Sequence, residues 1–270
     1  MQNPEALYGD WPRRRKALAA VLDEANPDLV GLVEAVVTDE YDQPRDLLGP
    51  DYHLAHGSAR GADGAGITIA SRWPIARVHE LDLHVTPRVD PDFPAATVVA
   101  EIDLPDPIGP TVFACTNPSW QLPLEFERQL QAVASARFLE TLADDRHVVL
   151  AGDFDATPEA TSMRFWRGLH ALDGMSVCYR DAWETAHPDD PGHTFTRENG
   201  RVAEGPVAWD VGRRIDYIMV RCGERGPSLD VTSCERTFDD AIDGVWASDH
   251  FGVVATFEPR ASPEPSEPTG

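Results

Sequence analysis

The sequence predicts an α/β protein in which two β-sheets pack face to face and helices cover their outer sides. Several apolar, strand-like runs follow one another without an intervening helix, as at residues 97–102 and 111–116. Segments with helical spacing of apolar residues are few, and the longest are residues 11–25 and 124–142. A strictly alternating parallel fold would place a helix after nearly every strand, so packed sheets with outer helices are the better interpretation.

The N-terminal half is predicted to contain one helix followed by strands. Residues 11–25 form the helix, because Leu18, Val21 and Leu22 recur at helical spacing and Pro12 is tolerated in a first turn. The helix ends at Asn26, since the proline that follows disfavours helical backbone there. Apolar runs then predict strands over residues 28–34, 66–71, 97–102 and 111–116.

The C-terminal half is predicted to add two helices, three strands and a long irregular region. The helices cover residues 124–142 and 160–169, and the strands cover residues 147–150, 215–220 and 252–257. Proline and glycine are dense in residues 187–212, which predicts a long excursion near the site. No linker interrupts residues 1–260, which are expected to form a single domain. Residues 261–270 are rich in Pro, Glu and Ser and are expected to be a disordered tail.

The chain of 270 residues carries a formal net charge of -23. A protein this acidic repels a phosphate backbone at long range, which disfavours nucleic acid as a partner unless a local basic patch compensates. The densest basic run is residues 13–16, and it is interpreted as a solvated helix face rather than such a patch.

The cysteines and the hydropathy bound the environment of the protein. The four cysteines show no C-x-x-C spacing, so a zinc site or a dense disulfide framework is not expected. We expect reduced, mostly buried thiols instead. No apolar run approaches the roughly 20 residues of a membrane helix, and no signal peptide is visible. We therefore expect a cytoplasmic monomer without a transmembrane segment.

Acidic side chains stand at the ends of several predicted strands, and a histidine accompanies one of them. These residues are Glu34, Asp153, Asp155, Asp216, Asp249 and His250. Carboxylate oxygens are hard ligands that suit Mg²⁺ or Mn²⁺ better than zinc, and a bound cation would relieve their mutual repulsion. Each acid taken alone is more often a turn or N-cap carboxylate. Their joint placement at strand ends, which converge in space, favours a metal-assisted site.

The order of these residues also indicates individual roles in phosphate chemistry. Gly152 permits a tight exit from its strand, and the i, i+2 spacing places Asp153 and Asp155 on one side of an extended backbone. His250 can donate to a phosphate oxygen or manage a proton near neutral pH. Asp216 is suited to orient that imidazole. The sequence therefore predicts a hydrolase.

At this point the motifs resemble the endonuclease/exonuclease/phosphatase superfamily, the metal-dependent fold shared with DNase I-type nucleases, sphingomyelinases and inositol-phosphate phosphatases. The resemblance extends from about Asn3 to Phe257. The motifs that carry it are PDLVGLVEA, GAGITIASRWPI, VVLAGDFDATP, RRIDYIMV and WASDHFGVVA, in that order.

The resemblance implies a four-layer α/β sandwich, DNase I-like, with two packed mixed β-sheets flanked by helices. It also implies site roles. The implied catalytic residues are His250, Asp216, Asp153 and Asp155. The implied metal ligands are Glu34, Asp249 and Asp153, with Mg²⁺ or Mn²⁺ as the cofactor. The implied substrate or phosphate ligands are Asn3, Asn117 and Asp155.

The chain departs from the family pattern in three places. Asp155 stands where the family usually has asparagine, and an ionised carboxylate accepts hydrogen bonds where an amide would donate. A histidine that many members carry is replaced by Thr116 or Asn117. Few residues precede Asn3, so the first core strand of the family is not visible in this sequence.

The leading function is metal-dependent hydrolysis of a phosphodiester or a phosphate monoester by an activated water. The acidic charge favours a small organic phosphate or a lipid head group as the substrate. A nuclease is the alternative within the enzyme class, and a non-catalytic phosphate-binding relative is the alternative outside it. Trp120 and Trp246 are interpreted as core or rim packing rather than as stacking platforms for the substrate.

Overall fold

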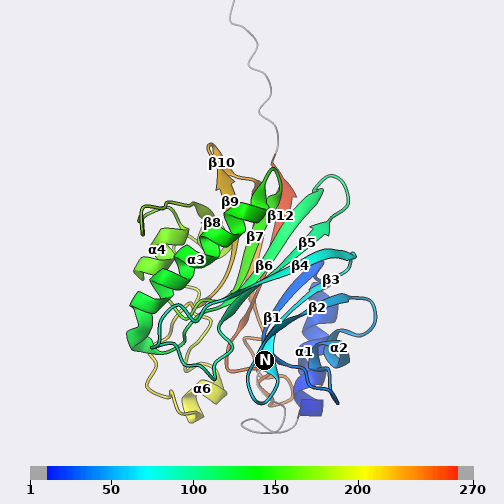
Figure 1. Cartoon of the computed structure of the whole chain (residues 1–270). Helices are drawn as coiled ribbons and strands as arrows, with labels where there is room; N and C mark the ends of the chain where they lie inside the picture. The colour runs from blue at the N-terminus through cyan, green and yellow to red at the C-terminus, as the bar shows by residue number, and fades with distance from the viewer. Residues whose placement is uncertain (1–10, 261–270) are drawn as a thin grey trace, which may run out of the picture.

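Two layers of β-structure form the centre of the fold and helices lie on both outer sides (Figure 1). This computed structural model describes residues 11–260. The larger sheet has seven strands in the order β10-β9-β7-β6-β5-β4, and β8 also pairs with β9. The strands of this sheet are β4 (Ile75–Asp82), β5 (Ala96–Asp103), β6 (Pro110–Asn117), β7 (His147–Asp153), β8 (Tyr179–Asp181), β9 (Asp216–Gly223) and β10 (Gly226–Pro227).

The second β-layer consists of a three-stranded sheet in the order β1-β3-β2 and the pair β11-β12, whose described pairings are antiparallel. Its strands are β1 (Leu29–Val36), β2 (His53–Arg60), β3 (Ala65–Ser71), β11 (Leu229–Thr237) and β12 (Gly252–Pro259). Strand β1 packs on β6 and β7, and β12 packs on β9. The two β-layers are therefore stacked face to face.

Apolar side chains fill the space between the two β-layers. Ile69 of β3, Val98 of β5 and Phe113 of β6 are buried there, together with Val149 of β7. Burial of such side chains stabilises the fold by roughly 1.5–3 kcal/mol each, which is why strands with apolar inner faces stay together.

Helices cover the outer face of each β-layer. They are α1 (Trp11–Ala25), α2 (Gln43–Leu48), the short 3-10 helix η1 (Leu122–Leu124), α3 (Glu125–Ala143), α4 (Thr161–Trp166), α5 (Ala182–Ala186) and α6 (Gly200–Glu204). Helices α3 and α4 bury Leu139 and Trp166 against the seven-stranded sheet. Helices α1 and α2 pack through Leu18 and Leu47 beside the smaller layer (Figure 1). The four-layer α/β sandwich is confirmed.

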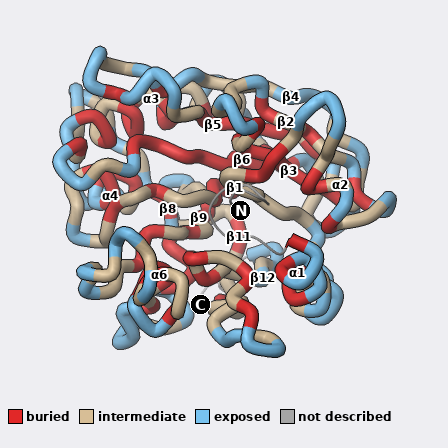
Figure 2. Tube along the Cα trace, turned by 90° about the horizontal axis from the view of Figure 1, so that it is seen from below, coloured by how far each residue is buried: buried red, intermediate tan, exposed pale blue. Residues whose placement is uncertain are grey.

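Strand directions bring the candidate site residues to one end of the sandwich. Strands β6 and β7 are parallel and joined by α3, so their C-terminal ends lie together. Strand β9 is antiparallel to β7, and its first residue, Asp216, lies directly opposite Asp153, the last residue of β7. His250 lies two residues before β12, which packs on β9. This end is at the bottom of Figure 1 and faces the viewer in Figure 2.

Several predicted boundaries differ from the structure for local reasons. The first helix covers Trp11–Ala25 as predicted, but the first strand continues beyond Glu34 to Val36. A β-bulge makes this possible, because the register shifts between Leu32 and Ala35 and Glu34 adopts a φ of 56°. Helix α4 is shorter than predicted and is followed by Gly168 with a φ of 76°.

The interpretation of residues 13–16 as a solvated helix face is wrong for Arg14. Arg14 is fully buried, and its Nε donates a hydrogen bond to the carbonyl of Ala247 at 2.9 Å. Arg15 and Lys16 remain exposed and pair with Asp46 and Asp243. The run is therefore neither a basic patch nor a purely solvated face.

The remaining expectations concern the chain ends, membrane-spanning helices and the cysteines. Asn3, the region before it and the predicted tail at 261–270 lie outside the described residues, and the single domain over 1–260 stays a prediction. No helix in residues 11–260 is long and apolar enough to cross a membrane. Cys115 and Cys234 are buried and Cys178 is exposed, so the thiols are less uniformly buried than predicted.

Candidate active site

The end of β7 presents two carboxylates because the chain turns sharply there. Gly152 has a φ of 141°, and a Cβ atom at this position would lie 2.1 Å from the carbonyl oxygen of Thr116. Phe154 is buried and packs edge-on against Tyr217 at 5.3 Å between ring centroids, which fixes the turn. Asp155 follows with a φ of 49°, and its backbone N–H donates to Asp153 Oδ1 at 2.9 Å. The two carboxylates are thus held at the C-terminal end of β7.

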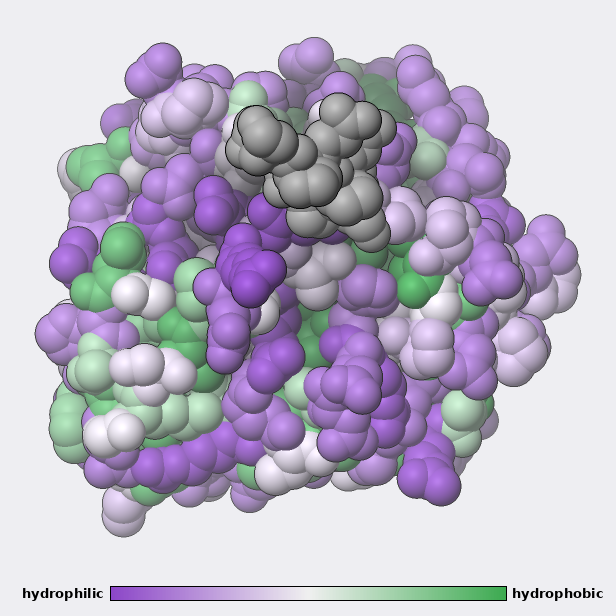
Figure 3. Space-filling view, turned by 90° about the horizontal axis from the view of Figure 1, so that it is seen from above, coloured by the Kyte–Doolittle hydropathy of each residue, from purple (hydrophilic) through white to green (hydrophobic). Residues whose placement is uncertain are grey.

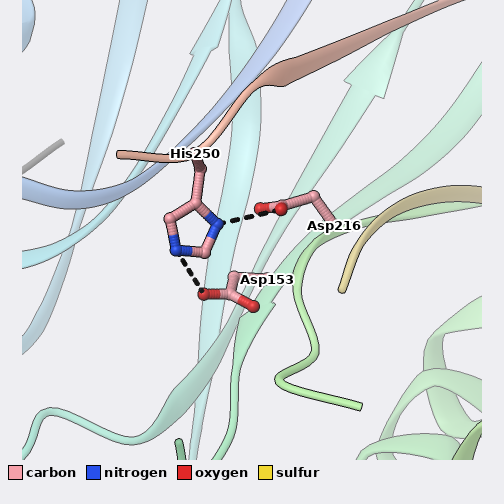
Figure 4. A group of neighbouring side chains, drawn as sticks. All are labelled: Asp153, Asp216 and His250. Carbon is pink, nitrogen blue, oxygen red and sulfur yellow. Dashed lines mark hydrogen bonds and ion pairs between the residues drawn. The ribbon is translucent and has the colours of Figure 1, made fainter. Parts of the chain in front are cut away.

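His250 lies between two of the predicted acids (Figure 4). Its Nδ1 is 2.9 Å from Asp216 Oδ2, and its Nε2 is 3.8 Å from Asp153 Oδ2. The ring of Phe195 lies 4.9 Å from the imidazole, measured between centroids, and limits its movement. Asp216 therefore orients the histidine through Nδ1, and Nε2 is directed toward Asp153.

Buried polar contacts position the segment that carries His250. Arg14 binds the carbonyl of Ala247, and the Asn199 side chain donates to the carbonyl of Ser248 at 2.9 Å. Thr194 Oγ1 accepts a hydrogen bond from the backbone N–H of Asp216 at 3.2 Å. Sequence reasoning missed Arg14 and Asn199 as supports of the site. No local pattern marks them, because their partners are more than 45 residues away in the chain.

The electrostatics of the cluster favour shared protons or a bound cation. Burial raises the pKa of Asp153 well above its usual value, and repulsion from Asp155 and Asp216 adds to this effect. Burial also raises the pKa of Asp155 to about 7, although His250, Arg128 and Arg213 oppose the shift.

The pKa of His250 responds to opposing causes. Burial alone would lower it, but the negative charges of Asp216 and Asp153 outweigh burial and raise the pKa well above its ordinary value. The imidazole is therefore held in its protonated form near neutral pH, between two acids.

The carboxylates of this cluster fit a divalent metal ion, with the protonated imidazole of His250 beside them. One ligand atom each from Asp153, Asp216 and His250 lies within 4.8 Å of the others. Burial is the main cause of the raised pKa of Asp153, and repulsion from Asp155 and Asp216 adds to it. A hard cation would offset both effects. Glu34 and Asp249 lie outside this group of three. Asp249 adjoins His250 in the chain and contributes to its raised pKa, and Glu34 lies in the β-bulge of β1.

A buried amide donor also points to a ligand at this end. Asn117, the last residue of β6, is 1% exposed, and its Nδ2 has no hydrogen-bond partner among the described residues. An unpaired buried donor is costly, so such a group commonly awaits a ligand or a water. This supports the expectation that Asn117 donates to a phosphate oxygen. Asn3, predicted for the same role, lies outside the described residues.

Arg128 and Arg213 supply positive charge that acts on Asp155. Both oppose the rise in the pKa of this carboxyl. Arg213 also lies over the ring of Phe195, with its Cζ 5.2 Å from the ring centroid. The excursion predicted at residues 187–212 therefore does border the site.

Comparisons with known proteins agree with this architecture. D. rerio TDP2 complexed with single-strand DNA product superposes with a TM-score of 0.72 at 20% identity, and the match covers 92% of each chain. An endonuclease/exonuclease/phosphatase from Bacteroides vulgatus superposes with a TM-score of 0.71 at 18% identity, covering 96% of this chain and 95% of that one. At these identities the likeness concerns the fold.

A curated relative is similar in sequence as well. Human sphingomyelin phosphodiesterase 2 is 26% identical over 275 aligned residues, which cover 95% of this chain. The chain spans 62% of the length of that relative.

The chain has the DNase I-like α/β sandwich, and the strand ends of this fold bring Asp153, Asp216 and His250 together. The sequence profile of the Endonuclease/Exonuclease/phosphatase family matches residues 6–250, and the chain belongs to this family.

Proposed function

We propose that this protein is a divalent-metal-dependent phosphohydrolase that cleaves a phosphodiester, or a phosphate monoester, by attack of water. The placement of His250 between Asp216 and Asp153 carries the proposal. A histidine oriented through Nδ1, with Nε2 directed toward a second acid, is suited to proton management beside a reacting phosphate.

The residues of the chain divide the work of the reaction. Asp153 accepts the proton of the water that attacks phosphorus as the ester P–O bond breaks. His250 is protonated, and its Nε2 stabilises the charge that develops on the phosphoryl oxygens or protonates the leaving oxygen. Asp216 holds the imidazole in place, and Asn117 donates to a phosphate oxygen through its unpaired amide.

Mg²⁺ or Mn²⁺ is the proposed cofactor. Asp153 is the proposed ligand common to the sequence expectation and the structural cluster, with Glu34 and Asp249 as further proposed ligands. A hard cation among these carboxylates supplies positive charge that polarises the phosphoryl group. Asp155 takes part either as a ligand or as a partner that shares a proton with Asp153.

A phosphodiester of a small molecule or a lipid head group is the proposed substrate. The relative named sphingomyelin phosphodiesterase 2 supports the diester, and the net charge of -23 disfavours long nucleic acid. The likeness to TDP2 complexed with single-strand DNA product keeps a nuclease as the second candidate. A cytoplasmic location and a monomeric state stay predictions.

The test is hydrolysis of a generic phosphodiester and a generic phosphomonoester with Mg²⁺, with Mn²⁺ and with EDTA. We expect turnover that requires the metal and falls by roughly 100-fold or more in His250→Gln, since general acid–base groups typically contribute that much. His79→Gln is the matched control, because His79 also pairs with a carboxylate, Glu101 at 2.7 Å, but within the β4–β5 pair. Metal or phosphate binding without any turnover would favour the non-catalytic reading instead.

A further inference from the structure

Two groups of exposed apolar side chains lie at the end of the molecule that carries the site. The first group comes from the segment that leads into α3 and from the first turn of that helix, where Trp120, Leu122 and Phe126 are 52%, 71% and 59% exposed. The second group follows α6, where Val207 is 40% exposed and Trp209 and Val211 are each 91% exposed. We call these six residues the apolar rim: Trp120, Leu122, Phe126, Val207, Trp209 and Val211.

Each half of the rim is tied to the site by an arginine. Arg128 donates to the backbone carbonyls of Ser119 and Gln121, both at 2.9 Å, and so holds the first half in place. Arg213 binds Asp210 at 2.7 Å within the second half. Arg213 lies over Phe195, whose ring centroid is 4.9 Å from that of His250, and Arg128 lines a small pocket together with Phe154, the residue between Asp153 and Asp155. Each half of the rim therefore adjoins the site.

The charges around the rim are balanced, in contrast to the whole chain. Within residues 197–213, arginines and acids occur in equal number: Arg197, Arg201, Arg213, Glu198, Glu204 and Asp210. Beside the first half, Arg128 pairs with Glu125 and Arg88 pairs with Glu127. No charged residue stands between Asn117 and Glu125 or between Glu204 and Asp210. The rim is thus an apolar, electrically neutral surface on a protein with a net charge of -23.

Figure 3 shows the opposite end of the molecule, where hydrophilic residues predominate with smaller hydrophobic patches among them. Exposed large apolar residues gathered around an active site mark an interaction surface more often than single ones do. The position of the rim therefore suggests that the substrate, or what holds it, is itself apolar.

We propose that the apolar rim docks on a bilayer of zwitterionic phospholipid and thereby holds the active site against the phosphodiesters of the head groups. Tryptophan favours the boundary between head groups and acyl chains, and aliphatic side chains favour the hydrocarbon beneath it. An anionic bilayer would repel so acidic a protein, whereas a neutral one does not. The catalytic part of this inference rests on the proposed function, but the docking does not.

Single-stranded nucleic acid is the competing occupant, because bases stack on exposed tryptophans. Such grooves combine aromatic residues with an excess of positive charge along the backbone path. The rim offers aromatic residues with balanced charges, so the bilayer is favoured.

The experiment is co-sedimentation with vesicles of pure phosphatidylcholine, repeated at high salt and with vesicles containing phosphatidylserine. We expect the wild-type protein to bind phosphatidylcholine vesicles and to remain bound at high salt. The double variants Trp120→Ser/Leu122→Ser and Trp209→Ser/Val211→Ser should each weaken partitioning by roughly tenfold or more, since each loses two large apolar contacts. Val78→Ser is the matched control, because Val78 is 48% exposed but lies within β4. Its partitioning should match that of the wild type.

Several outcomes would overturn the docking. These are absence of wild-type binding, equal weakening by Val78→Ser, or binding that needs phosphatidylserine and disappears at high salt. Binding of a single-stranded oligonucleotide that the rim variants abolish, without vesicle binding, would assign the rim to nucleic acid. Wild-type turnover of a small phosphodiester, measured without vesicles, reports separately on the proposed function. Vesicle binding without that turnover would contradict the proposed function but support the docking. Turnover without vesicle binding would support the proposed function but contradict the docking.

Discussion

The carboxyl of Asp155 should make the metal-free protein less stable as the pH rises, and Asp155→Asn should remove this effect. Its pKa is raised from 3.8 to about 7 in the folded protein, chiefly by burial. The folded state therefore holds this proton more tightly than the unfolded state does. Stability is lost as the pH rises through the interval between these two values, and the full loss is present above pH 7.

The size of the effect follows from the shift. One pKa unit corresponds to about 1.36 kcal/mol, so the interval from pH 5 to the folded-state pKa contributes roughly 3 kcal/mol at most. Asp155 keeps partial contact with solvent and interacts with Asp153, which reduces the expected effect to about 2 kcal/mol. The stabilisation by Asp155→Asn should therefore be about 2 kcal/mol larger at pH 8 than at pH 5.

The assay is urea unfolding of both proteins at pH 5 and pH 8 in the presence of EDTA. Asp189→Asn, a substitution at an exposed aspartate, serves as the control and should show no such pH dependence. A stability difference between wild type and Asp155→Asn that is the same at both pH values would refute the reasoning. In that case the carboxyl would not carry a raised pKa.

Other perturbations test the turn, the histidine and the metal. Gly152→Ala should destabilise the protein by about 3 kcal/mol or more in urea unfolding, because a Cβ meets backbone at 2.1 Å, whereas Gly223→Ala meets nothing within 4 Å and should cost little. Asp216→Asn should lower the pKa of His250, seen as a shift of its NMR titration to lower pH in metal-free protein, because a negative charge that raises this pKa is lost. Addition of Mg²⁺ or Mn²⁺ to metal-free protein near pH 7 should raise its thermal unfolding midpoint. It should also release protons, because the acids lose their bound protons on coordination. Calorimetry in buffers of different ionisation enthalpy detects this release. Asp153→Asn should reduce both effects, and a response that the variant leaves intact would place the metal elsewhere.

The motifs pointed to Asp153, Asp216 and His250 because each stands at or beside a strand end, and the fold brings these three residues together. Apolar runs before Asp153 and after Asp216 and His250 predict strands by local pattern alone, and those strands are present as β7, β9 and β12. The missed elements were short or half-exposed. Strands β2 and β4 alternate imperfectly between apolar and polar residues, so they give a weak periodic signal.

The supports of the site were not predictable in the same way. Arg14 and Asn199 contact the segment that carries His250 from 233 and 49 residues away in the chain. A basic residue in a helix is usually solvated, and only packing of α1 against Ala247 changes the environment of Arg14. The apolar rim was likewise not predictable from the sequence, because its two halves are distant along the chain.

By itself, the sequence determined the sandwich architecture, the family, and the acids and histidine that stand at strand ends. The packed sheets and the strand-end residues follow from periodicity and adjacent residue types, and the family follows from the resemblance of five motifs. All of these are local properties of the chain. Only the tertiary structure decided that His250 bridges Asp216 and Asp153, that the pKa of Asp155 rises to about 7, and that two apolar segments flank the site. Distances, burial and charge interactions depend on which residues come into contact across the fold. Strand register and packing determine those contacts.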